Sequence, residues 1–240
     1  MRMFAGPNGS GKSTLKTVLQ PELIGIYLNP DDIEKQIASN GIIDLAQFGI
    51  KVTNEQVSKF FESSELLQKG TTTDLEIPRL EGTILTVDRA TASEYQAAAV
   101  TEFIRYQLIH QKTSFTFETV MSHESKIDFL RYAHEQGFRT YLYYIATSDP
   151  IININRVKNR VKLGGHPVLE EKIRSRYTRS LALLLEAIRN TDRAYIFDNS
   201  FESRDASSPT WIAEITEGKQ LRMESDSEPA WFKAAVLDKL

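Results

Sequence analysis

Short apolar runs alternate with longer segments of helical spacing along most of the chain. The runs that predict buried strands lie at residues 3–5, 24–28, 114–119, 139–146 and 193–197. Between them, apolar residues recur at intervals of three and four, which is typical of helices that cover a sheet. This alternation predicts an α/β fold of three layers, αβα, with a mostly parallel sheet.

Other segments extend or interrupt this alternation. A helix is expected over residues 15–19, another from Pro30 onward, a last strand at 211–216 and a closing amphipathic helix at 231–237. The stretch 41–89 fits poorly, since it combines a helical pattern (54–68), a polar linker (71–73) and a β-like run (83–87). We therefore expect one domain over residues 1–240, with an insertion at about 41–89 after the second strand.

Composition narrows the classes of partner. The 240 residues, 41% of them hydrophobic, can bury one substantial core, and the net charge of −3 provides no field that attracts polyanions, so no nucleic acid is expected. The chain has no cysteine, which excludes disulfides, thiolate zinc sites and a cysteine nucleophile.

No apolar run approaches the ~20 residues that cross a bilayer, and no leader precedes the first motif, so a cytoplasmic protein with no membrane partner is expected. Whether Met1 is the native start stays open.

A glycine-rich loop follows the first predicted strand. It satisfies G-x-x-x-x-G-K-[ST] at every fixed position, and its residues are Gly6, Pro7, Asn8, Gly9, Ser10, Gly11, Lys12 and Ser13, followed by Thr14. Glycines let the backbone direct successive N–H groups toward one anion at a helix N-terminus. Lys12 would then reach the β- and γ-phosphates, while the Ser13 hydroxyl would bind Mg²⁺. The motif predicts a P-loop NTPase fold that binds ATP or GTP.

Two acids directly follow the second predicted strand. Asp31 would lie at the carboxyl end of that strand and could take a proton from an acceptor hydroxyl. Asn29, Asp31 and Asp32 are also good helix-start residues, so capping explains Asp31 equally well.

A further acid ends the third predicted strand. Glu118, with Thr119 after it, stands at the edge of the sheet that would face the phosphates, where it could orient Mg²⁺ or bind the acceptor. The alternative is a solvated strand end.

Basic residues flank a glycine turn at residues 164–165, and together they suggest a lid over about 160–176. The cations are Arg156, Arg160, Arg174, Arg176 and Arg179, and His166 lies in the turn. Kinases need cations that neutralise the transferring phosphoryl group. Any single arginine is more readily explained as a solvated helix residue, so the prediction rests on the cluster. His110, His123 and His134 show no spacing that predicts a metal site.

Taken together, these motifs resemble the zeta toxin family of P-loop kinases, including the branch labelled predicted ABC-type ATPases. The resemblance rests on six segments. They are the glycine loop (residues 6–14), the turn after the second strand (29–32), the end of the third strand (117–119), Arg160 with the glycine turn (164–166), the arginine segment 174–177 and the last parallel strand with the residues after it (195–200). The resemblance implies phosphoryl transfer from ATP or GTP to a hydroxyl, the best-known acceptor being the amino sugar of UDP-N-acetylglucosamine, and an antitoxin protein is a partner that such a kinase could have.

The resemblance also implies roles for individual residues. Lys12 matches the phosphate lysine, Asp31 the general base, Glu118 the strand acid and Arg160 a phosphate-sensing arginine. The second lid arginine falls near Gly165 and His166 here, so Arg174 or Arg176 would have to supply that charge. We therefore expect Lys12, Asp31, Arg160 and Arg176 in catalysis, and Asp31, Glu118, Thr119, His166 and Arg174 in substrate binding. Ser13 and Glu118 are the expected metal ligands.

Two other functions stay open. A nucleotide-gated ATPase or switch would pass a signal to a protein partner, although no strand ends in the Asp-Glu pair of motor ATPases. A scaffold with an inactive site is disfavoured because Lys12, Ser13, Asp31 and Glu118 are all present.

Overall fold

A computed structural model describes residues 1–17, 19–65, 67, 77–89, 93–200 and 208–240. The chain forms two compact units, Met1–Gly25 with Thr116–Leu240, and Ile26–Phe115. The predicted linker at 71–73 lies outside the described residues. In the described ranges, no helix combines the length and the apolar character that a bilayer crossing requires.

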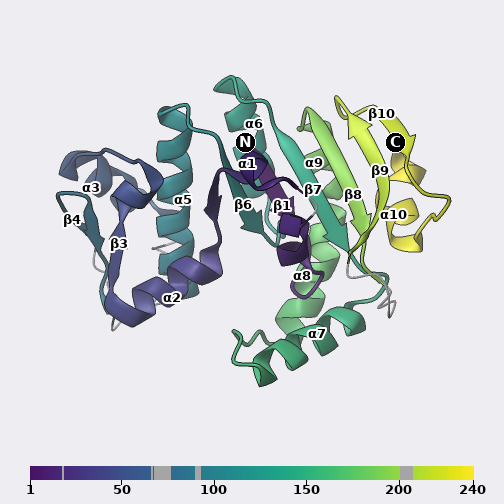
Figure 1. The fold of residues 1–240 in the computed structure, drawn as a ribbon, viewed down its shortest axis with the longest axis horizontal. Coiled ribbons are helices and arrows are strands. Elements are labelled where there is room, and N and C mark those ends of the chain that lie inside the picture. Colours follow the sequence, from purple (N-terminus) through teal and green to yellow (C-terminus); the bar gives the residue numbers. More distant parts are fainter. Residues whose placement is uncertain (18, 66, 68–76, 90–92, 201–207) are drawn as a thin grey trace. The chain divides into compact units, whose positions relative to one another are not determined.

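A mostly parallel sheet forms the centre of the first unit, as the alternating pattern predicted. Its strands are β1 (Arg2–Ala5), β6 (Phe115–Thr119), β7 (Tyr141–Ala146), β8 (Arg193–Asp198), β9 (Thr210–Thr216) and β10 (Gln220–Met223). They run in the order β10-β9-β8-β7-β1-β6 (Figure 1). The pairs β6–β1, β1–β7 and β7–β8 are parallel, whereas β9 and β10 pair antiparallel at one edge. The predicted α/β fold class is confirmed.

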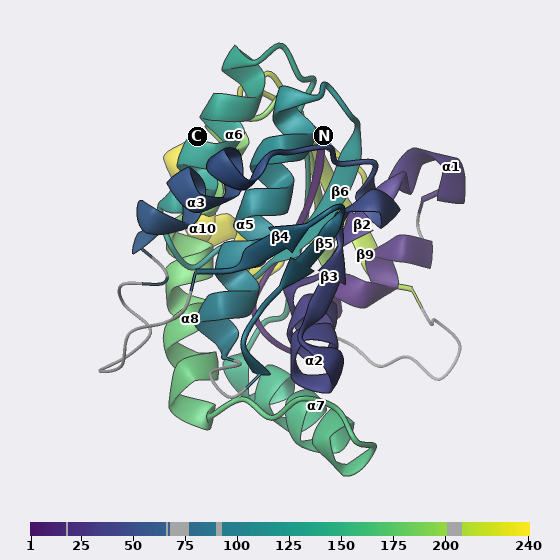
Figure 2. The same cartoon turned by 90° about the vertical axis from the view of Figure 1, so that its left-hand side faces the viewer.

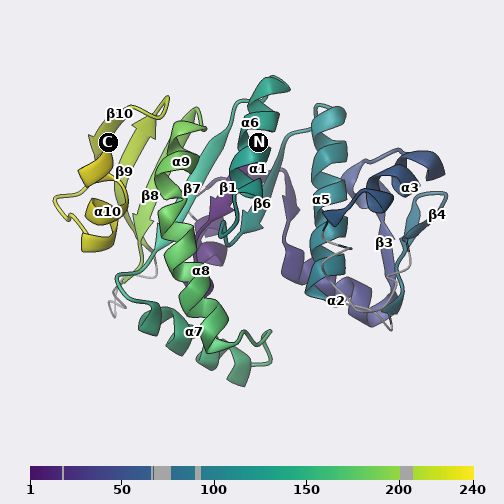
Figure 3. The ribbon, with the colours of Figure 1, turned by 180° about the vertical axis from the view of Figure 1, so that it is seen from behind.

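Helices surround this sheet, and several of them cover one of its faces. The helices of the first unit are the 3₁₀ helix η1 (Lys12–Thr17), α1 (Pro21–Ile24), α6 (Ser125–Glu135), α7 (Pro150–Lys162), α8 (Glu170–Ala182), α9 (Leu184–Arg189), α10 (Ala230–Ala235) and the 3₁₀ helix η4 (Leu237–Lys239). Figure 3 shows α6, α8, α9 and α10 on one face. Ring contacts join that face to the sheet, because Phe117 lies 5.5 Å from Phe129 of α6 and Tyr144 lies 6.2 Å from Trp231 of α10, centroid to centroid.

The buried hydroxyl of Tyr144 is partnered within this core. It lies 3.0 Å from Ser180 Oγ of α8, and Ser180 in turn donates to the carbonyl of Val120 at 2.8 Å. Burial raises the pKa of Tyr144, so its ring stays neutral and acts as a core residue. Helix α8 is thereby joined to the ends of β6 and β7.

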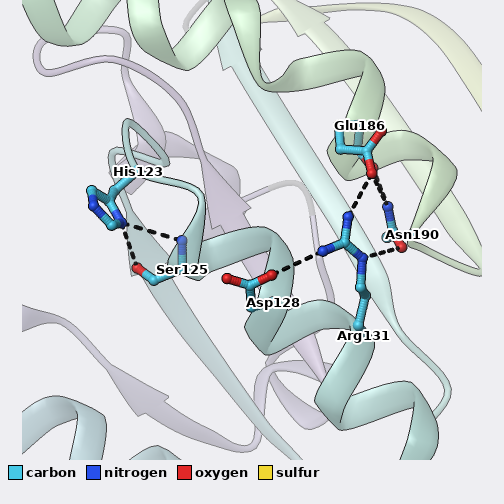
Figure 4. Close-up of polar contacts among 6 residues, drawn as sticks. All are labelled: His123, Ser125, Asp128, Arg131, Glu186 and Asn190. Carbon is cyan, nitrogen blue, oxygen red and sulfur yellow. Dashed lines mark hydrogen bonds and ion pairs between the residues drawn. The ribbon is translucent and has the colours of Figure 1, made fainter.

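A polar network joins α6 to α9 (Figure 4). The Arg131 guanidinium donates to Asp128 Oδ1 at 2.8 Å, to Glu186 Oε1 at 2.6 Å and to Asn190 Oδ1 at 3.0 Å. An exposed ion pair contributes little alone, but a guanidinium with three partners holds both helices in one relative position.

The start of α6 also explains one of the histidines. His123 Nδ1 accepts a 3.2 Å hydrogen bond from the Ser125 backbone N–H, and Ser125 Oγ lies 3.1 Å away (Figure 4). His123 therefore satisfies an otherwise unpaired N–H of the first helical turn.

The second unit contains a small antiparallel sheet (Figure 2). Its elements are β2 (Ile26–Leu28), α2 (Pro30–Asn40), β3 (Ile42–Asp44), η2 (Leu45–Phe48), α3 (Asn54–Glu62), β4 (Arg79–Glu81), β5 (Ile84–Thr86) and α5 (Glu94–His110), and the sheet order is β3-β5-β4. Helix α3 packs on α5 through Phe60 and Phe61, which lie 5.2 and 5.3 Å from Phe103.

Most of the predicted helices and strands are present, but they begin and end at other residues than predicted. Helix α3 covers the first part of the expected helix at 54–68 and begins with a capping box formed by Thr53 and Gln56, whereas residues 66 and 68 lie outside the described residues. The expected helix at 15–19 is the 3₁₀ helix Lys12–Thr17, and the closing helix at 231–237 is divided between α10 and η4. Strand β10 was not predicted.

Candidate functional site

The glycine loop connects β1 to η1 and adopts a backbone that only glycine tolerates easily. Gly6, Gly9 and Gly11 have φ values of +147°, +78° and +100°. Side-chain-bearing residues rarely adopt these angles, so the three glycines are required by the shape of the loop.

Three neighbours enclose the loop at these glycines. A Cβ at Gly6 would lie 2.0 Å from the carbonyl oxygen of Ile145 in β7, and one at Gly9 would lie 2.4 Å from the carbonyl oxygen of Asn153 in α7. A Cβ at Gly11 would lie 2.3 Å from Nδ2 of Asn199, directly after β8. The loop is therefore held against the carboxyl ends of β7 and β8, where open α/β sheets bind ligands.

Lys12 lies close over the loop. Its ammonium donates to the carbonyl oxygens of Gly6 at 2.9 Å and Pro7 at 3.0 Å, and the Thr14 hydroxyl donates to the Gly11 carbonyl at 2.6 Å. The positive charge is thus placed beside the backbone that would surround a phosphate group.

Some polar atoms around the loop suit an anionic ligand. Within the described part of the chain, Ser10 Oγ and Asn153 Nδ2 are buried without a hydrogen-bond partner. Buried polar atoms normally have partners, and both Ser10 and Asn153 carry donors there. The residues present therefore fit a phosphate group at this loop.

The expected metal ligands belong to the same unit. Ser13 is exposed at the start of η1, and Glu118 pairs in register with Phe4, two residues before the loop. Across the described ranges, no cluster of three or more His, Asp or Glu side chains could hold a metal by itself. The residues fit Mg²⁺ that is bound through one or two protein oxygens, nucleotide phosphates and water.

Thr119 follows Glu118 at the same edge of the sheet. Both are buried, and Thr119 pairs in register with Ala5, the residue before the loop. Thr119 Oγ1 accepts a 3.1 Å hydrogen bond from the Met121 N–H, which leaves its own proton for another acceptor. The predicted strand end thus lies directly beside the start of the loop.

The predicted lid residues differ in their surroundings. Arg160 Nη2 donates to the His166 carbonyl at 2.9 Å, which closes the turn after α7. Arg174 donates to Glu170 at 2.8 Å within α8, so its charge is already paired. Arg176 is half-buried and lies one helical turn before Ser180, on the side of α8 that contacts Val120.

Helix α8 is also attached to the end of β7. The Tyr177 hydroxyl donates a 2.6 Å hydrogen bond to the carbonyl of buried Thr147. Burial, reinforced by the charges of Asp149 and Asp198, raises the pKa of Tyr177 to about 12, so the phenol remains a donor. Helix α8, whose first part belongs to the predicted lid, is therefore joined to the end of the strand that borders the loop.

Asp31 lies in the second unit, near the start of α2. Asn29 is the N-cap of that helix, and its side chain accepts from the Asp31 N–H at 3.0 Å. Asp32 is exposed and lies 3.9 Å from Lys35. The Asp31 carboxylate is half-buried and has no ion pair or hydrogen bond with a described residue. Asn29 is therefore the N-cap residue, and the Asp31 carboxylate does not cap the helix.

Two residues at the loop were not predicted as site residues. Asn153 had no signal, because it lies within an ordinary amphipathic helix. Asn199 stands in the Asp-Asn-Ser segment after β8, and polar residues at that end of a parallel strand were an available signal.

Comparisons with known proteins agree with this fold. No protein-family model matches the chain. A protein of Haemophilus influenzae, described as uncharacterized, is 39% identical over 174 residues, which are 72% of this chain and 89% of the relative.

Solved structures are similar at low sequence identity. A chain from the PezAT chromosomal toxin-antitoxin system of Streptococcus pneumoniae is 13% identical with a TM-score of 0.51, over 100% of this chain and 79% of that chain. A chain from AvrRxo1-ORF1:-ORF2 with ATP is 17% identical with a TM-score of 0.50, over 93% of this chain. The match spans only 60% of the AvrRxo1 chain's own length.

The fold and the glycine loop define a P-loop α/β protein with the fold expected from the zeta toxin resemblance. By sequence identity and coverage, the chain belongs to the same family as the Haemophilus influenzae protein.

Proposed function

We propose that this protein is a P-loop kinase that transfers the γ-phosphoryl group of ATP or GTP to a hydroxyl of a small molecule. The observation that carries the proposal is the glycine loop, with its required positive φ values and with Lys12 held beside it. Loops of this kind bind the triphosphate through backbone N–H groups. The AvrRxo1 structure with ATP shares the fold and is consistent with nucleotide binding.

Asp31 is the proposed general base. Its carboxylate has no ion pair or hydrogen bond with a residue that the structure describes, whereas Asp32 lies 3.9 Å from Lys35. It would take the proton of the acceptor hydroxyl as that oxygen attacks the γ-phosphorus and the nucleoside diphosphate leaves. This role separates a kinase from an ATPase, which activates water instead.

Ser13 would hold Mg²⁺, with Glu118 nearby, and the ion would supply positive charge beside the transferring phosphoryl group. Glu118 and Thr119 would also contact the acceptor. Among the lid residues, Arg160 and Arg176 would supply positive charge during transfer, and Arg174, which donates to Glu170, would contact the substrate. His166 would lie in the moving turn.

The acceptor and the partner are proposed by analogy alone. A UDP-N-acetylamino sugar follows from the zeta toxin resemblance, and an antitoxin protein from the toxin-antitoxin system that shares the fold. Such an acceptor would place the activity in the cytoplasm. We treat residues 1–240 as one kinase domain, with 41–89 as an insertion and 160–176 as its lid.

The test is incubation with γ-labelled ATP or GTP, Mg²⁺ and a panel of nucleotide sugars, nucleosides and cofactors. We expect a labelled acceptor product, with nucleoside diphosphate formed only when that acceptor is present. Labelled inorganic phosphate released at the same rate with or without any panel member would instead indicate an ATPase or switch. Leaving Mg²⁺ out should abolish the transfer.

A further inference from the structure

The carboxamide of Asn199 contacts the glycine loop across most of the length of the chain. Its Nδ2 donates a 2.8 Å hydrogen bond to the carbonyl oxygen of Ser10, 189 positions earlier in the sequence. The same Nδ2 lies 2.3 Å from where a Cβ of Gly11 would be, so the side chain packs directly on the Ser10–Gly11 peptide.

Asn199 is itself held from both sides. Its backbone N–H donates to Ala146 at the end of β7 at 2.8 Å. The preceding Asp198 is buried and accepts from Trp231 Nε1 at 2.8 Å and from Ser200 Oγ at 2.6 Å. The Ser200 oxygen also accepts from the Ser148 N–H at 2.8 Å. The carboxamide therefore projects from a segment with little freedom to move.

A trans peptide directs its C=O and its N–H to opposite sides. The Ser10 carbonyl points to Asn199, so the Gly11 N–H points away from it. Gly11 has φ of +100°, and glycine permits the peptide before it to rotate at low cost. A rotated peptide would present the Ser10 carbonyl oxygen, rather than an N–H, to an anion in the loop.

We propose that Asn199 is a positioning residue that keeps the Ser10–Gly11 peptide in the orientation that binds phosphate. It acts through the Ser10 carbonyl and does not touch the nucleotide. This role rests on the proposed nucleotide-binding function of the loop.

The test exchanges the donor for an acceptor with Asn199→Asp. An ionised carboxylate only accepts hydrogen bonds, so it repels the Ser10 oxygen, whereas a protonated carboxyl group can donate again. A carboxylate facing a carbonyl has a pKa above the usual ~3.9, so binding should recover as the pH falls from 8 to about 5. We expect the Kd of Mg²⁺-ATP, measured by titration calorimetry, to rise about 30-fold at pH 8 relative to wild type and to return to within about threefold at pH 5.

Two further variants make the result specific. Asn199→Ala removes the donor without adding charge, and we expect about tenfold weaker binding that does not recover at low pH. Asn190→Asp makes the same exchange in the network between α6 and α9 and should leave the Kd unchanged. Thermal melting of each variant at both pH values shows whether it is folded. If Asn199→Asp does not fold, the affinity of Asn199→Ala for Mg²⁺-ATP tests the positioning role.

Failure of the inference differs from failure of the proposed function. If wild type binds Mg²⁺-ATP and folded Asn199→Asp binds within twofold of it at pH 8, the positioning role is wrong and the proposed function stands. A loss of affinity in Asn199→Asp that is the same at pH 5 and pH 8 also contradicts the role. If wild type binds neither Mg²⁺-ATP nor Mg²⁺-GTP, both proposals are wrong.

Discussion

The indole N–H of Trp231 donates a 2.8 Å hydrogen bond to Oδ1 of Asp198, which joins the last α-helix to the end of β8. Asp198 is only 7% exposed, so water cannot readily replace this donor. Replacing Trp231 with Phe should lower the free energy of unfolding by about 1–3 kcal/mol, the loss expected for a buried hydrogen bond to a carboxylate. Chemical denaturation of wild type and Trp231→Phe measures this difference in the free energy of unfolding.

Trp211→Phe is the comparison for that prediction. Trp211 is 38% exposed and donates to a neutral carbonyl, that of Ala213, at 3.1 Å. We expect a smaller loss, below about 1 kcal/mol. Equal losses for the two variants would mean that the Asp198 contact contributes nothing specific.

Gly6 should tolerate no side chain. Gly6→Ala places a Cβ 2.0 Å from the Ile145 carbonyl oxygen and forces the loop to move. We expect the affinity for Mg²⁺-ATP to fall at least about 100-fold, because the loop N–H groups no longer point to one phosphate. Gly137→Ala is the control, since Gly137 also has positive φ (+81°) but no atom within 4 Å of its Cβ position. An unchanged Kd for Gly6→Ala would show that the loop does not bind the phosphates.

The two lid arginines of α8 should differ in their effect on transfer. Arg176→Ala should lower kcat by about 10²–10³ while the nucleotide Kd changes little, as expected for a charge used only during transfer. Arg174→Ala should change kcat by less than about threefold, because Arg174 is paired with Glu170 at 2.8 Å. The opposite ranking in steady-state assays would assign the lid charge to Arg174.

Asp31 and Asp32 are neighbouring acids of α2, so the variant of Asp32 is a control for the variant of Asp31. Asp31→Asn should lower kcat for transfer by about 10²–10⁴ and leave nucleotide binding intact, since a general base acts on the acceptor. Asp32→Asn should be nearly neutral, because Asp32 is exposed and only loosely paired with Lys35. If both variants transfer at the wild-type rate, the base must lie elsewhere.

The sequence pattern predicted the parts of the fold that depend on local signals. Buried parallel strands are continuous apolar runs, and the glycine loop has residue types at fixed spacing, so both are visible in one chain. Strand β10 was missed because Gln220 and Arg222 make it polar, as an edge strand can be.

The contacts that shape the site could not be predicted in the same way. Asn199 reaches Ser10 only because β8 and the loop end at the same edge of the sheet, and nothing local in the sequence indicates that pair. The capping question at Asp31 also needed structure, since Asn29 and Asp31 are both good N-cap residues and only the observed hydrogen bond selects Asn29.

Binding of a nucleoside triphosphate at the glycine loop is the central claim, and titration of wild type and Lys12→Ala with Mg²⁺-ATP and Mg²⁺-GTP tests it most directly. We expect saturable one-to-one binding to wild type and at least about tenfold weaker binding to folded Lys12→Ala, because the ammonium beside the loop carbonyls of Gly6 and Pro7 is lost. Equal binding by the two proteins, or no binding by wild type, would contradict the claim.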